Sequence, residues 1–250
     1  LDISNSMLAQ DIKPDRLSRA KQALYKLIDK LQGDRIGIII FAGKAYTQLP
    51  ITTDYAAAKM FVSTITPKDI PSQGTAIGEA IYLGMESFEE NNQSKAIIVI
   101  TDGENHEGSA TDAATEASQL GMRVYTIGMG LPDGSPIPII NSYGQQTGFK
   151  KDREGNTVIT KLNEIMLQQI AAAGNGDYVR ANTTQAGLSK IFEKINALEK
   201  SEIETRMFTD YEDQFQYFLG FGLILIFLEF LIFDRKTKWA RHIRLFERNN

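Results

Sequence analysis

The stretch KAIIVITDG, at residues 95–103, contains five consecutive apolar residues and ends in a threonine, an aspartate and a glycine. A short run rich in isoleucine and valine and closed by a turn signal is typical of a strand buried on both faces of a sheet. The stretch RIGIIIFAG, at residues 35–43, has the same character. Because such strands belong to parallel sheets covered by helices, these two runs predict an α/β fold.

Helical patterns alternate with the predicted strands. Apolar residues recur at helical spacing in six segments, at residues 16–32, 54–65, 76–89, 110–120, 163–173 and 184–200. Further strands are expected at residues 44–50, 123–130 and 177–181. The alternation predicts a doubly wound, mostly parallel sheet with helices on both faces, in a domain over residues 1–200. Such sheets place their binding sites at the carboxyl ends of the strands.

The alternating pattern lapses between residues 131 and 162. Turn signals at 132–134 (PDG) and 154–156 (EGN) flank two β-rich runs, which predicts a protruding hairpin inserted into the domain. Two interpretations are open for this hairpin. It is either a tolerated surface insertion or an element that docks a partner.

Cysteine content and charge exclude several classes of function. The chain of 250 residues has no cysteine, so disulfides, thiolate zinc sites and cysteine nucleophiles are ruled out. Residues 234–250 carry six Lys or Arg and two acidic residues, whereas the remaining chain carries 21 basic and 29 acidic residues. A body with this acidic excess is unsuited to binding nucleic acid.

A membrane-spanning segment is predicted near the C-terminus. Residues 215–233, FQYFLGFGLILIFLEFLIF, contain one charged residue, Glu229. As a helix they would be about 28 Å long, close to the thickness of a bilayer's hydrocarbon core of about 30 Å. They follow a juxtamembrane linker at 201–214 and precede the basic tail at 234–250. The positive-inside rule then predicts a protein of the bacterial inner membrane, with residues 1–210 periplasmic and the tail cytoplasmic. Glu229 is expected to face a packing partner or to reach water.

Oxygen-bearing side chains gather where three segments are predicted to reach the carboxyl edge of the sheet. One segment is the opening LDISNS, which would be the end of a central strand. Further apolar residues of that strand, and one or two membrane spans, are then expected upstream of it. Two carboxylates and three hydroxyls of this kind suit Mg²⁺, or else Mn²⁺ or Ca²⁺, and disfavour zinc and copper. Hydroxyl ligands leave the ion free to recruit a carboxylate from a partner. The candidate metal ligands are Asp2, Ser4, Ser6, Thr75 and Asp102.

On these five residues the chain resembles a von Willebrand factor type A (VWA) domain, which has a Rossmann-like fold. The family's metal-ion-dependent adhesion site has the motif Asp-x-Ser-x-Ser…Thr…Asp, and the resemblance covers about residues 1–200. It implies that Ser4, Ser6 and Thr75 touch the ion directly. It also implies that Asp2 and Asp102 act largely through water or hydrogen bonds, and that an acidic side chain of a partner protein completes the coordination.

The C-terminal span, the basic tail and the hairpin insertion make the chain similar to the Bat (Bacteroides aerotolerance) membrane proteins, of the BatA/BatB type. This resemblance implies a role in envelope stress or in the assembly of protein complexes. It also implies two kinds of partner, namely other Bat-type membrane proteins and a MoxR-type AAA+ ATPase.

The leading hypothesis is a membrane-anchored binding module, not an enzyme, that captures a partner protein through Mg²⁺. One alternative is a structural subunit of a membrane complex with a vestigial metal site. Another is a Mg²⁺-dependent phosphoryl-transfer enzyme with an aspartate nucleophile, for which His106 would be the candidate base. The enzyme is disfavoured because the second carboxylate of an acid–base pair and a glycine-rich phosphate loop are missing.

Overall fold

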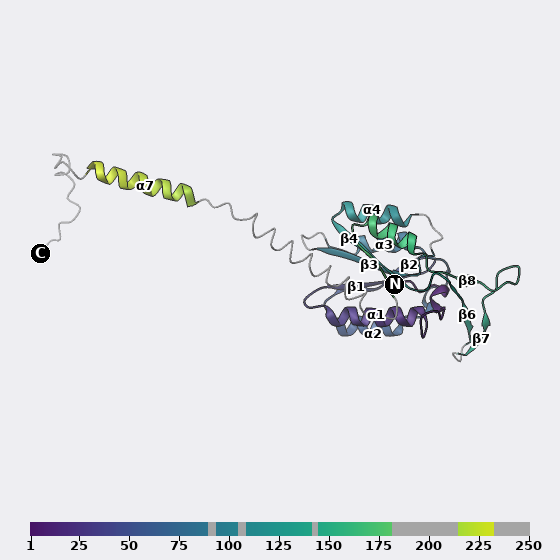
Figure 1. Ribbon diagram of the computed structural model, residues 1–250. Helices are drawn as coiled ribbons and strands as arrows, with labels where there is room; N and C mark the ends of the chain where they lie inside the picture. The colour runs from purple at the N-terminus through teal and green to yellow at the C-terminus, as the bar shows by residue number, and fades with distance from the viewer. Residues whose placement is uncertain (90–93, 105–108, 142–144, 182–214, 233–250) are drawn as a thin grey trace. The chain divides into compact units, whose positions relative to one another are not determined.

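The computed structural model describes residues 1–89, 94–104, 109–141, 145–181 and 215–232. The chain divides into two units, Leu1–Glu199 and Lys200–Asn250, and the first is an α/β body (Figure 1). Several predicted features lie outside the described residues, namely His106, the helix at 184–200, the linker at 201–214 and the tail at 234–250.

The sheet of the body consists of two groups of strands. An antiparallel pair is formed by β1 (Ile36–Phe41) and β2 (Ala45–Thr52). A parallel group is formed by β3 (Lys95–Thr101), β4 (Met122–Gly128) and β9 (Tyr178–Arg180), in the order β3-β4-β9. The predicted α/β fold with a mostly parallel sheet is therefore confirmed.

Residues 1–3 join the two groups into one sheet. The Asp2 amide donates to the Ile100 carbonyl oxygen of β3 at 2.9 Å. On the other side, the Ile3 amide donates to the Phe41 carbonyl oxygen of β1 at 2.8 Å, and the Phe41 amide donates to the Leu1 carbonyl oxygen at 3.0 Å. Asp2 pairs with Phe41 in the parallel direction. The opening residues thus lie in the middle of the sheet, with their carboxyl end at the same edge as those of β1 and β3.

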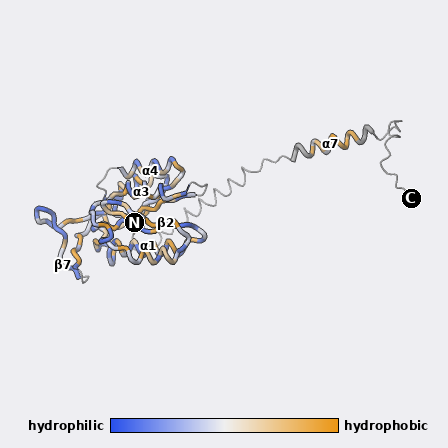
Figure 2. The backbone as a smooth tube through the Cα atoms, turned by 180° about the vertical axis from the view of Figure 1, so that it is seen from behind, coloured by the Kyte–Doolittle hydropathy of each residue, from blue (hydrophilic) through white to orange (hydrophobic). Residues whose placement is uncertain are grey.

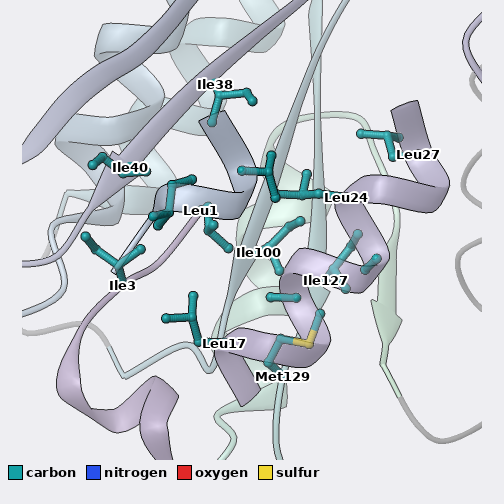
Figure 3. Packing of buried hydrophobic residues seen from close by; sticks show 14 of the residues in the cluster. Leu1, Ile3, Leu17, Leu24, Leu27, Ile38, Ile40, Ile100, Ile127 and Met129 are labelled. Atoms are coloured by element: carbon teal, nitrogen blue, oxygen red, sulfur yellow. The ribbon is translucent and has the colours of Figure 1, made fainter. Parts of the chain in front are cut away.

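Helices cover both faces of the sheet, which explains why the strands are apolar without alternation. One face is covered by α1 (Arg16–Lys30) and α2 (Tyr55–Thr64), and the other by α3 (Ile77–Glu86), α4 (Ala110–Gln119) and α5 (Glu164–Ala173) (Figure 1). Successive residues of β3 serve opposite faces, since Ile100 packs with α1 and Val99 with α3 and α4. In Figure 3, Leu24 of α1 lies beside Ile100.

The first helix shows how the local sequence specifies these elements. Asp15 caps α1, because its Oδ1 accepts the Ser18 amide at 2.7 Å and its Oδ2 accepts the Ser18 hydroxyl at 2.7 Å. Hydrophobic and hydrophilic residues alternate along α1 (Figure 2), so the helix presents an apolar stripe to the sheet. The helix ends before Gly33, whose φ of 88° belongs to the left-handed region.

Residues 131–162, which we call the arm, form two short antiparallel ribbons beside the body (Figure 1). The strand β5 (Ser135–Pro136) pairs with β8 (Ile159–Thr160), and β6 (Pro138–Ile140) pairs with β7 (Gln146–Phe149). Four large apolar side chains of the arm are exposed, those of Ile139, Ile140, Phe149 and Ile159.

A helix, α7 (Phe215–Ile232), occupies the segment that the sequence predicts to span a membrane. Within the described parts of the chain, however, no helix combines the length and the apolar character needed to cross a bilayer. The transmembrane helix expected at 215–233 stays a prediction.

Burial against the sheet predicts how strongly single side chains of the helices stabilise the fold. Ile28 of α1 is 1% exposed, whereas Ile165 of α5 is 71% exposed. We expect Ile28→Ala to lower the free energy of unfolding by about 3 kcal/mol, because it leaves a cavity under α1. Ile165→Ala is the matched control and should change it by less than about 0.5 kcal/mol. Urea titration followed by circular dichroism measures both, and equal losses would contradict this packing.

Candidate metal centre

Asp2 lies at the end of the central strand, and both of its carboxylate oxygens accept hydrogen bonds. Its Oδ1 accepts the Ser4 amide at 2.8 Å, and its Oδ2 accepts the Thr101 hydroxyl at 2.6 Å. The chain then turns into a short 3₁₀ helix, η1 (Asn5–Leu8), which carries Ser6. The Ser4 and Ser6 Oγ atoms lie 2.9 Å apart. Asp2 thus orients a loop whose two hydroxyls converge on one point.

Asp102 follows β3 and meets the same loop from the neighbouring strand. Its Oδ2 accepts Arg16 Nη1 at 2.9 Å and the Thr160 hydroxyl at 3.4 Å, while its Oδ1 accepts the Glu104 amide at 3.1 Å. The Ser6 side chain interacts with this carboxylate and opposes the rise in its pKa, and the Thr101 hydroxyl donates to Asp2 Oδ2. Two segments a hundred residues apart in sequence are therefore joined directly.

Thr75 reaches this edge on a loop held against the end of β1. The Gly43 amide donates to the Ser72 carbonyl oxygen at 3.0 Å, and the Ala76 amide donates to the Ala42 carbonyl oxygen at 2.7 Å. Gln73 Oε1 accepts the Asn5 amide of the serine loop at 3.2 Å. The structure thus brings all five predicted residues to one edge of the sheet, and all five are buried.

Burial gives this cluster an unusual electrostatic character. Asp2 and Asp102 are both 0% exposed. Burial, and then repulsion from Asp102, raise the pKa of Asp2 to about 7, against hydrogen bonds from Thr101 and Ser4 that lower it. Burial also raises the pKa of Asp102, although Ser6 and Arg16 oppose the shift. Two buried carboxylates that resist ionisation together are stabilised by an added positive charge.

The donor set suits a hard divalent cation. Among the described residues, no three or more histidine, cysteine or acidic side chains form a group that could hold a metal ion. An ion at this edge would instead meet the hydroxyls of Ser4, Ser6 and Thr75, with Asp2 and Asp102 behind them. Oxygen donors of this kind favour Mg²⁺, Mn²⁺ or Ca²⁺.

Arg16 is the residue of this site that the sequence alone did not reveal. Its side chain is 0% exposed and forms ion pairs with Asp102 and with Asp11, whose Oδ2 lies 2.7 Å from Nη2. A basic residue in the first turn of a helix is opposed by the helix dipole, and this was the only signal available in the sequence.

Comparison with known proteins identifies relatives of this chain. A family model described as the von Willebrand factor type A domain matches residues 1–104. The crystal structure of an aerotolerance-related membrane protein from Bacteroides fragilis is 52% identical, with a TM-score of 0.74, over 78% of this chain and 96% of that one. BatB from Bacteroides thetaiotaomicron is 50% identical, with a TM-score of 0.76, over 80% and 96%.

More distant similarities extend to other bacteria and to animals. A UPF0353 protein of Nocardia farcinica is 31% identical over 74% of this chain and 57% of its own length. The chain spans between about half and three fifths of the curated relatives that it matches. Proximal thread matrix protein 1 of the mussel byssus, described with a zinc-occupied metal-ion-dependent adhesion site, shares the fold at 21% identity and a TM-score of 0.54, over 78% of this chain and 42% of its own.

Fold, site and comparisons together define a von Willebrand factor type A domain protein. Within that class, the chain belongs to the family of the Bat aerotolerance-related proteins.

Close packing of the Thr75 loop on β1 leads to a prediction about Gly43. A Cβ atom at Gly43 would lie 2.7 Å from the Gln73 carbonyl oxygen and 3.0 Å from that of Ser72. Gly43→Ala should therefore displace the loop, cost about 1–3 kcal/mol of stability and speed hydrogen exchange of the Ala76 amide. At Gly148 nothing lies within 4 Å of such an atom, so Gly148→Ala is the control. Unchanged exchange at Ala76 in the Gly43 variant would refute the packing argument.

Proposed function

We propose that this chain is a binding module that captures a partner protein through a divalent cation, Mg²⁺ in the first instance. The cation would be held by Ser4, Ser6 and Thr75 and oriented by Asp2 and Asp102. The observation that carries the proposal is the burial of both carboxylates beside converging hydroxyls. A cation relieves their repulsion and retains enough charge to bind an acidic side chain of the partner.

The oxygen donors of the site determine only the class of the cation, namely a hard divalent ion. Mg²⁺ prefers oxygen ligands in octahedral geometry and keeps several waters, which leaves room for a carboxylate from outside. Two proteins that share the fold are described with zinc and with manganese, the mussel byssus protein and the TRAP protein of Plasmodium vivax. Mn²⁺ and Zn²⁺ therefore belong in the same titrations as Mg²⁺.

Binding is favoured over catalysis because of how the carboxylates are engaged. Both oxygens of Asp2 accept hydrogen bonds, from Ser4 and Thr101, and both oxygens of Asp102 accept them as well. When every oxygen of a carboxylate accepts a hydrogen bond, that carboxylate is a weaker nucleophile toward phosphorus. A phosphatase screen of the purified protein with Mg²⁺ tests this, and turnover that Asp102→Asn abolishes would favour the enzyme.

Membrane attachment and the Bat system complete the proposal. The similar protein of B. fragilis is named a membrane protein, and residues 215–233 of this chain contain one charged residue, Glu229. We infer that the C-terminal segment attaches the chain to the bacterial inner membrane, with the VWA domain periplasmic and the basic tail cytoplasmic. Other Bat-type proteins and a MoxR-type ATPase are the proposed partners, in envelope stress or complex assembly.

Loss of one carboxylate should weaken the metal site without unfolding the domain. We expect Asp2→Asn to lower Mg²⁺ affinity by roughly 10–100-fold, because the amide keeps the shape but not the charge. Asp112→Asn, in the exposed first turn of α4, removes one negative charge from the same protein and should leave the affinity unchanged. Isothermal titration calorimetry measures each variant.

Partner capture provides the second half of that test. Crosslinking and affinity purification from native membranes should recover the same protein with Mg²⁺ and lose it with EDTA or with Asp2→Asn. If calorimetry finds no Mg²⁺ binding even when the captured partner is present, the alternative of a structural subunit with a vestigial site is correct. Capture that persists undiminished in EDTA would also refute the proposal.

Membrane attachment is tested by truncation. We expect the whole chain to remain in the membrane fraction after carbonate extraction at high pH, because its C-terminal segment is apolar. A chain that ends at residue 214 should be released into the supernatant. Release of both forms would show that the segment is not an anchor.

A further inference from the structure

A guanidinium, that of Arg16, lies beside Asp102 without reaching solvent. The Arg16 side chain donates five hydrogen bonds, all to groups on three other segments of the chain. Nε and Nη2 donate to the two oxygens of Asp11 at 2.9 and 2.7 Å. Nη1 donates to Asp102 Oδ2 and to the Thr160 hydroxyl, each at 2.9 Å, and Nη2 also donates to the Thr160 carbonyl oxygen at 3.2 Å.

Burial of the Arg16 guanidinium costs free energy, which its hydrogen bonds and ion pairs must offset. A fully buried cation loses its hydration, and Arg16 in addition heads α1, where the helix dipole is unfavourable for positive charge. Burial alone lowers the pKa of Arg16, yet the contacts with Asp11 and Asp102 raise it above the ordinary value. The guanidinium is therefore charged, and its place depends on both carboxylates.

Both ends of the arm are attached to this guanidinium. At the start of the arm, the Leu131 amide donates at 2.8 Å to Asp11 Oδ2, an oxygen that also accepts from Arg16. At its end, Thr160 contacts Arg16 through both its hydroxyl and its carbonyl oxygen. The Lys161 amide then donates to Glu104 Oε1 at 2.8 Å, two residues beyond Asp102.

The backbone that leads into the arm is shaped around the same group. Gly130 has a φ of 132°, and a Cβ atom there would lie 2.8 Å from Arg16 Cζ. A side chain at this position would therefore be strained and would also collide with the guanidinium. The close approach of the backbone to the guanidinium indicates a specific, closely packed junction between the arm and the body.

We infer that Arg16 is a positioning residue that couples the arm to the metal centre. This inference rests on the proposed function, because it assumes a cation beside Asp102. Opening of the base of the arm breaks the Thr160 contacts and frees Asp102, whereas a bound cation restrains Asp102 and, through Arg16, the arm. By reciprocity, a partner that grips the arm raises the affinity of the site for the cation.

Hydrogen exchange with and without Mg²⁺ tests this coupling in the full chain in detergent. The amides of Leu131 and Leu162 report on the base of the arm, since they donate to Asp11 and to the Leu131 carbonyl oxygen respectively. We expect Mg²⁺ to slow their exchange about tenfold in the wild type, a change of about 1.4 kcal/mol. Arg16→Lys, which keeps the charge but loses the fork of donors, should abolish this protection.

Two further variants make the result specific. Arg35→Lys alters another guanidinium that binds a carboxylate with two hydrogen bonds, to Glu89 at the surface, and should keep the wild-type protection. Thr160→Val removes only the hydroxyl, leaves both ion pairs intact and should reduce the protection. If Arg16→Lys fails to fold by circular dichroism, the Thr160 variant decides, and full protection in it overturns the inference.

Calorimetry on the same samples distinguishes a failure of the coupling from a failure of the proposed function. If Mg²⁺ binds the wild type but leaves the arm amides unchanged, the coupling is wrong and the proposed function stands. Protection that survives in Arg16→Lys equally overturns the role of Arg16. If no Mg²⁺ binds the wild type, either alone or with the captured partner present, the proposed function and the coupling both fall.

Discussion

Two carboxylates buried at one edge of a sheet are the constraint on which the rest of this structure depends. Asp2 and Asp102 have no exposed surface, and each would be unstable as an anion without compensation. Hydrogen bonds from backbone amides and hydroxyls supply part of this compensation, and the guanidinium of Arg16 supplies further compensation for Asp102. The remaining negative charge is the basis of the proposed cation site.

The fold provides this constraint through its central strand. Residues 1–3 take hydrogen bonds from both sides, so Asp2 is fixed between β1 and β3 at the point where the chain turns away. Asp102 leaves the neighbouring strand one residue after Thr101, whose hydroxyl binds Asp2. The two carboxylates are therefore held at the ends of strands, while the hydroxyls of the serine loop are carried on the turn that follows.

Much of this arrangement was predictable. The apolar runs at 35–43 and 95–103 identified two strands because burial on both faces requires continuous apolar sequence. The five oxygen-bearing residues were identified because parallel strands end at one edge, and the structure brings them there. The segment at 215–233 was different, since its composition indicated a membrane span that the described residues do not show.

The sequence by itself determined the alternation of strands and helices and the chemical character of the site, because hydrophobic periodicity and residue type are local properties. Only the tertiary structure decided which charge balances Asp102. Arg16, Asp11 and Thr160 are far from it in the chain, and nothing in their spacing indicates that they meet. Their meeting depends on how α1 and the arm pack at the edge of the sheet, and a contact of that kind exists only once the chain has folded.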